Sequence, residues 1–116
     1  MTPEGRLMRE IMLATSKAGA RLQRMNAGVA WTGGPIIRND DGSVTIKNAR
    51  PFHCVVRGVS DLCGLDATGR FVAIEVKTPT GRVTKDQLAF IEAVRRSGGR
   101  AGVARSVPDA LAILSQ

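Results

Sequence analysis

Apolar residues recur at helical spacing along three stretches of the chain, and each stretch opens with residues suited to cap a helix. The first helix is predicted from Pro3 to about Gly19, the second over residues 84–97, and the third from Ser106 towards the end. The residues expected on the buried faces are Leu7, Met8, Ile11, Met12 and Ala14 in the first helix, Leu88, Ile91 and Val94 in the second, and Leu111 and Leu114 in the third.

Strands are predicted between these helices. The strongest covers residues 71–76, and a turn at 66–69 joins it to a short apolar run at 62–65. Residues 101–104 form a short buried strand, and residues 21–31 hold a further strand with partial alternation. The strands before and after the second helix should be parallel with a right-handed crossover, whereas the hairpin is antiparallel. The order predicts an α/β fold with a mixed sheet and helices on both faces.

The length of 116 residues fits one domain, residues 1–116. Residues 32–57 are the least determined part. Asp41 and Gly42, between two apolar runs, indicate a hairpin turn there. We therefore expect residues 32–57 to form an exposed excursion from the core.

The two cysteines, Cys54 and Cys63, are not part of a Cys-x-x-Cys motif, and the single histidine, His53, has no partner motif. A zinc site would need more ligands, so both thiols are expected to be reduced in a cytoplasmic protein. No signal peptide or membrane-spanning run is evident. Nothing in the sequence indicates a small-molecule cofactor or a membrane partner.

Charge gives the first indication of function. Seventeen Lys and Arg against ten Asp and Glu give a net charge of +7, and most of the basic residues are arginine. Arginine suits phosphate oxygens, so the excess favours nucleic acid as a partner. Only one Trp, three Phe and no Tyr are present, which argues against a surface that holds single strands by stacking. The residues favoured for DNA contact are Arg21, Arg24, Arg57, Arg82 and Lys85.

The candidate chemistry lies between Asp61 and Lys77. Alternate side chains of a strand share a face, so Glu75 and Lys77 project to one side. Pairing about the 66–69 turn brings Asp61 opposite approximately residue 74, within one residue of Glu75. Asp61, Glu75 and the Val76 carbonyl would hold Mg²⁺ or Mn²⁺ through hard oxygen ligands, and Lys77 would act on the water or the developing charge. The alternative is a salt-bridged pair on a solvent-facing strand.

Gly58-x-x-Asp61, the hairpin, Ile74-Glu75-Val76-Lys77 and Gln87 together resemble the PD-(D/E)xK nucleases, and more narrowly the stand-alone VRR-Nuc domains of phages and bacteria. Ser60 stands where proline is common. The resemblance implies a restriction-endonuclease-like αβββαβ core, a phage or bacterial origin, and a metal-dependent endonuclease. It also implies homodimers that cut four-way (Holliday) DNA junctions.

Two further residues have double interpretations. Gln87 lies three residues after Thr84 as in a capping box, and the resemblance makes it an active-site residue. Glu10 is expected to border the buried face of the first helix, where it would meet an arginine or, as the resemblance implies, support the metal site. Asp66 is interpreted as turn chemistry.

Three alternative functions stay open. The same fold could act on flaps or nicked duplex, as larger relatives do. The chain could be a non-catalytic nucleic-acid-binding module with a structural acidic pair. It could also be an arginine-rich protein–protein module of a phage particle, without salt-dependent DNA affinity.

Overall fold

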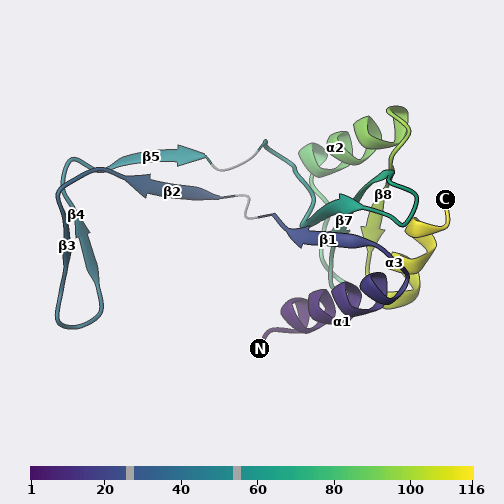
Figure 1. Ribbon diagram of the computed structural model, residues 1–116, viewed down its shortest axis with the longest axis horizontal. Helices are drawn as coiled ribbons and strands as arrows, with labels where there is room; N and C mark the ends of the chain where they lie inside the picture. Colours follow the sequence, from purple (N-terminus) through teal and green to yellow (C-terminus); the bar gives the residue numbers. More distant parts are fainter. Residues whose placement is uncertain (26–27, 54–55) are drawn as a thin grey trace. The chain divides into compact units, whose positions relative to one another are not determined.

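The computed structural model describes residues 1–25, 28–53 and 56–116 (Figure 1). Cys54 and the side chain of His53 lie outside the described part. The chain divides into two compact units, one of residues 1–25 with 57–116 and one of residues 26–56. No described helix is long and apolar enough to cross a membrane.

Three helices and eight strands form in the described residues. The helices are α1 (Pro3–Lys17), α2 (Lys85–Arg96) and α3 (Val107–Leu114). The strands are β1 (Arg21–Arg24), β2 (Val29–Thr32), β3 (Ile36–Arg38), β4 (Val44–Ile46), β5 (Arg50–His53), β6 (Leu62–Leu65), β7 (Phe71–Val76) and β8 (Arg100–Ala104).

The larger unit is built on a four-stranded sheet in the order β1-β6-β7-β8. β1 pairs with β6, and β6 with β7, antiparallel, whereas β7 and β8 are parallel across α2. Along the chain the order is α1-β1-β6-β7-α2-β8-α3. This confirms the predicted αβββαβ core and its mixed sheet.

Helices cover the two faces of this sheet, as predicted (Figure 1). Val72, Ile74 and Val76 of β7 pack with buried residues of α1 and α3 on one face. The intervening Ala73 packs with Ile91 and other residues of the α2 face. Because side chains alternate along a strand, Glu75 lies on the same face as Ala73. The site is therefore on the α2 face.

Two expected core positions are wrong. Leu88 is 48% exposed and Leu111 is 37% exposed. In α2 the inward stripe runs through Gln87, Ile91 and Val94, at spacings of four and three, so Leu88 lies one position to the side. α3 likewise buries Ala110 and Ile113 instead of Leu111, whereas the predicted Leu114 is partly buried against the core.

The smaller unit consists of paired strands. β2 pairs with β5, and β3 pairs with β4, both antiparallel. The predicted turn at Asp41 and Gly42 is confirmed, since Gly42 has φ +88° and Asn39 N–H donates to the Ser43 carbonyl. The strand predicted within residues 21–31 is confirmed as β1, which ends where Met25 N–H donates to the Asp61 carbonyl. β2 begins in the same stretch but belongs to another sheet. The unit begins at residue 26, not at 32.

Candidate active site

The hairpin of β6 and β7 brings Asp61 beside Glu75. Leu62 pairs with Ile74, so the preceding Asp61 continues the register level with Glu75. Asp61 Oδ2 accepts a hydrogen bond of 2.9 Å from Val76 N–H. This contact fixes the carboxylate of Asp61 at the end of β7, and it bears out the predicted juxtaposition.

Gly58 joins the loop before Asp61 to the start of α2. Its φ is +81°, a region that glycine adopts without strain. A Cβ atom here would lie 2.3 Å from the Asp86 carbonyl oxygen. The position therefore requires glycine for two reasons, and the close approach holds Asp61 near the first turn of α2, where Gln87 is located.

Glu75 is a buried carboxylate with only part of its oxygen surface satisfied. It is 2% exposed. Oε1 accepts a 2.9 Å hydrogen bond from Gln87 Nε2 and lies 3.7 Å from Lys77 Nζ. Oε2 is buried and has no hydrogen-bond partner among the described residues. An unpaired buried carboxylate oxygen is costly in a fold, and a ligand at this position would remove the cost.

The environment raises the pKa of Glu75 from 4.5 to about 8. Burial is the largest cause because it disfavours the charged form, and the negative charge of Asp61 adds to it. Lys77 acts in the opposite direction. When both carboxyl groups are ionised, they outweigh the single ammonium, and a cation would neutralise the excess negative charge.

Gln87 completes the predicted capping box and also contacts Glu75. Its backbone N–H donates to Thr84 Oγ1 at 3.1 Å, and its Oε1 accepts from Thr84 N–H at 2.9 Å, which completes the capping box. Its Nε2 donates to Glu75. The side-chain oxygen holds the helix start while the nitrogen holds the carboxylate, so α2 positions Glu75 rigidly.

The donor set fits a hard divalent cation. Asp61 and Glu75 offer carboxylate oxygens, and in an extended strand the N–H and C=O of one residue point to the same edge. Because Val76 N–H faces Asp61, its carbonyl oxygen does so too. No group of three or more His, Cys, Asp or Glu side chains forms a metal cluster in the described residues. Such a pair resembles Mg²⁺ sites that use one or two carboxylates, with water and substrate phosphate completing the shell.

Glu10 does not join this network. Met8, Ile11 and Thr15 form the buried face of α1, and the helical turn directs Glu10 away from it. Glu10 is exposed, and no hydrogen bond or ion pair found in the described chain links it to Asp61 or Glu75. The expectation that it borders the buried face is wrong.

The five basic residues predicted to contact DNA are all exposed: Arg21, Arg24, Arg57, Arg82 and Lys85. Arg57 Nε lies 3.9 Å from Asp86 Oδ2 between two largely exposed side chains, a pair that contributes little stability. Arg82 and Lys85 flank the cap of α2, close in the chain to Gln87. All five remain accessible to a polyanion.

Arg105 was not singled out from the sequence. It follows β8, which ends level with β7, and it donates to the Thr78 carbonyl at 2.6 Å and the Gly81 carbonyl at 2.7 Å. These bonds hold the turn that links Lys77 to α2. The parallel pairing of β7 with β8 points to this residue. It sets Ala104 beside Val76, so Arg105, the next residue, lies near the chain that follows Lys77.

Two other predictions concern the hairpin. Asp66 is confirmed as a turn residue: Oδ1 accepts from Thr68 and Arg70, and Oδ2 accepts from Arg100 Nε at 2.7 Å. The Thr68 hydroxyl, first among these contacts, holds the pKa of Asp66 below its ordinary value. Cys63 is a free, buried thiol as expected. Its burial, with Glu75 and Asp61 nearby, raises its pKa to about 11.

The comparison with protein families decides the identity of the domain. The VRR-NUC domain model matches residues 11–108, which include the whole Asp61–Gln87 constellation. The chain belongs to the VRR-NUC domain family. VRR-NUC domains are nuclease-type domains, so the substrate class is nucleic acid. The match begins one residue after Glu10. A search of curated proteins gave no match.

Proposed function

We propose that this VRR-NUC domain is a Mg²⁺- or Mn²⁺-dependent, structure-selective DNA endonuclease that cuts four-way junctions as a homodimer. The observation that carries the metal dependence is Glu75: a buried carboxylate with one oxygen unpartnered, facing Asp61 at the end of β7. A purely structural acidic pair would be expected to have both carboxylates paired or solvated.

In this proposal, Asp61, Glu75 and the Val76 carbonyl hold the cation. When bound, the metal neutralises charge on the scissile phosphate and lowers the pKa of the attacking water. Gln87 keeps Glu75 Oε1 in a fixed direction through its 2.9 Å hydrogen bond, which leaves Oε2 for the ligand. Glu75 loses its proton as the cation binds, because ligands must be deprotonated.

Lys77 supplies the positive charge of the site. Its ammonium lies 3.7 Å from Glu75 Oε1 and its side chain is 17% exposed, so it reaches from the carboxylates towards solvent. There it donates hydrogen bonds to a phosphate oxygen or to the attacking water and stabilises the charge that develops in the transition state.

Phosphates outside the reacting position contact exposed arginines and the start of α2. The first turn of a helix offers free N–H groups to anions, and Arg82 and Lys85 flank this turn. Contacts of this kind fix the register of the DNA without reading its sequence. One chain carries one such site, so the symmetrical cutting of a four-way junction favours two copies related by a two-fold axis.

A direct test compares wild type with Glu75→Gln and Lys77→Ala on a labelled four-way junction with Mg²⁺, Mn²⁺ or EDTA. We expect cleavage with either metal, none in EDTA, and at least about a 100-fold loss in each variant. Lys17→Ala, an exposed lysine at the end of α1, is the matched control and should cleave normally. Full activity in EDTA or in Glu75→Gln contradicts the proposed chemistry.

The substrate and the oligomer are tested separately. A panel of four-way junction, flap, nicked duplex and linear duplex at one salt concentration should rank the junction first. Sedimentation of the protein alone and with the junction should show two copies. A preference for flaps, or cutting by a single copy, overturns this part of the proposal and leaves the metal chemistry standing.

A further inference from the structure

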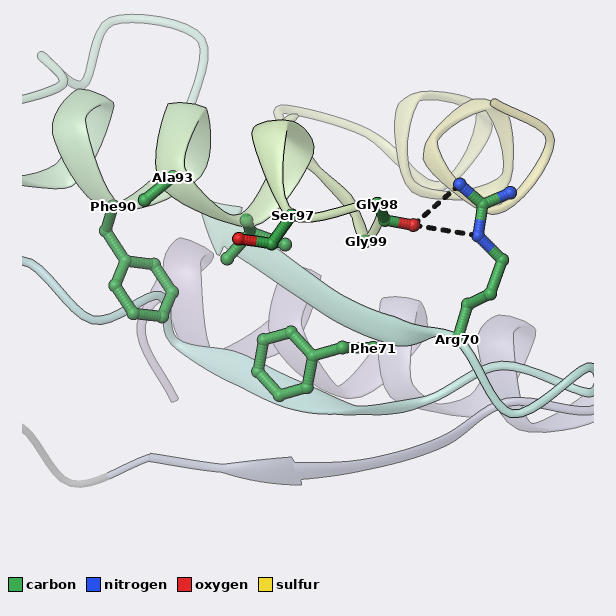
Figure 2. Close-up of a pocket in the computed structure, with 8 residues that line it drawn as sticks. Arg70, Phe71, Phe90, Ala93, Ser97, Gly98 and Gly99 are labelled. Carbon is green, nitrogen blue, oxygen red and sulfur yellow. Dashed lines mark hydrogen bonds between the residues drawn. The ribbon is translucent and has the colours of Figure 1, made fainter.

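A hollow opens on the α2 face of the sheet, at the opposite end of β7 from Glu75 (Figure 2). Its volume is about 540 Å³. The rings of Phe71, from β7, and Phe90, from α2, both project into it, and Arg70 lies at its rim with its guanidinium donating to the Gly98 carbonyl. The lining is otherwise formed by small residues of α2 and the turn that follows it.

A second hollow of about 360 Å³ shares Phe71 and Phe90 and continues over β1 and β6. Its lining includes Arg21, Met25 and Cys63. Met25 N–H donates to the Asp61 carbonyl, so this second hollow reaches the vicinity of the candidate metal site. The two hollows adjoin at Phe71 and Phe90, and we refer to them together as the channel.

The channel exists because α2 covers only part of its face. α2 packs mainly against β8 and β7 and reaches Cys63 of β6, whereas β1 is not among its main contacts on this face. Phe71 is consequently 42% exposed. Phe71 and Glu75 share one face of β7 and are four residues apart, so about 13 Å separates them along the strand. At about 3.4 Å per nucleotide of one duplex strand, that span corresponds to about four nucleotides.

We propose that this channel receives an unpaired base of the DNA substrate, stacked on Phe71 and Phe90. Aromatic rings bind bases of any sequence because every base has a π face. Every charged residue in the lining of the two described hollows is an arginine, and Arg21 and Arg70 lie at positions where a backbone phosphate can be met. A purely apolar ligand would not need this charge.

The scarcity of aromatic residues in the chain limits such a site to a small one. Few aromatic residues exclude an extended stacking surface, but two of the three phenylalanines line this one channel, which suffices for one or two bases. The inference rests on the proposed function, since it assigns the channel to the same DNA substrate. It implies that a four-way junction with an unpaired nucleotide at its branch point is bound more tightly than the same junction fully paired.

The test measures binding and requires no cleavage. A blunt duplex and the same duplex with a short thymidine tail are titrated with protein in EDTA, and the ratio of the two Kd values is compared between variants. Phe71→Leu and Phe90→Leu keep an apolar side chain but remove the ring. Phe52→Leu is the matched control, because Phe52 is 47% exposed and lies in β5, outside the channel.

We expect the wild type and Phe52→Leu to bind the tailed duplex more tightly, and each channel variant to reduce this preference by about 5- to 10-fold. Phe71→Trp, with a larger ring, should retain it. An unchanged Kd ratio in both leucine variants overturns the proposal, as does a change of oligomeric state without a change in the ratio. The binding measurement contains no metal, so failure of the nuclease proposal would appear only in the cleavage assay. Failure of the base-binding proposal would appear only in the Kd ratio, and the two outcomes are therefore distinguishable.

Discussion

Replacing Glu75 with glutamine should make the metal-free protein more stable at alkaline pH while it abolishes cleavage. The carboxyl is buried, faces Asp61 and has a pKa of about 8 in the folded chain against an ordinary value of 4.5. Between these two values the folded state keeps a proton that the unfolded state has lost. The free energy of unfolding of the wild type therefore falls as pH rises through this window and levels off above about pH 8.

The size of the effect follows from the displacement of the pKa. Full deprotonation of Glu75 would lower the free energy of unfolding by about 5 kcal/mol, at about 1.4 kcal/mol for each pH unit. Partial solvent relaxation around a site at the end of the sheet reduces the expected loss to about 2–4 kcal/mol. Glutamine keeps the shape of Glu75 and can still accept from Gln87 Nε2, but it carries no charge to repel Asp61. The variant should thus lack this part of the pH dependence.

The assay is urea unfolding of both proteins in EDTA at pH 5, 7 and 9. The difference in unfolding free energy, variant minus wild type, should be small at pH 5 and should grow towards pH 9, since other titrating groups cancel. Glu92→Gln, an exposed residue of α2, is the control and should give no trend. Added Mg²⁺ or Mn²⁺ should stabilise the wild type at pH 9 and leave Glu75→Gln unchanged. Parallel pH profiles of the two proteins would refute the argument.

Three further substitutions test the supports of the site. Gly58→Ala should destabilise the fold by about 1–3 kcal/mol, because of its positive φ and because a Cβ atom would lie 2.3 Å from the Asp86 carbonyl oxygen. Gly28→Ala, with open space around it, should not, and thermal unfolding distinguishes the two variants. Gln87→Ala should lower stability by about 1 kcal/mol through the lost cap and should also reduce cleavage, and a change in only one of these contradicts its double role. Arg105→Ala should leave metal binding by calorimetry unchanged but should lower cleavage about 10-fold, since it releases the carbonyls of the turn after Lys77; wild-type activity would contradict this.

The local parts of the fold could be predicted because local chemistry specifies them. Thr84 and Gln87 form a capping box that the sequence spells out, and the Asp66 turn fixes the register that brings Asp61 level with Glu75. The bounds of β7 follow from a six-residue run between turns that is apolar except for Glu75. These features depend on residues within about one turn or hairpin of each other.

Features that depend on distant partners were not predictable. The pairing of β2 with β5 brings together segments about 20 residues apart that lack a strong alternating pattern. The exposure of Leu88 depends on how α2 rotates to direct Gln87 at the sheet, which helical spacing alone does not determine. The degree of burial of Glu75, and with it the raised pKa, depends on the packing of α2 against this face of the sheet, which forms only in the folded chain.

The hairpin that carries Asp61 and Glu75 has a consequence for how this domain tolerates change. Both carboxylates belong to one pair of adjacent strands, and the turn between them is held by Asp66. One inserted residue within β6 or β7 would flip the side chains beyond it to the opposite face and separate the pair. Insertions before Gly58, by contrast, leave this register untouched. The acidic pair is thus sensitive to a single-residue insertion inside a short hairpin and tolerant of added chain outside it, and residues 26–56, a separate compact unit, lie outside it.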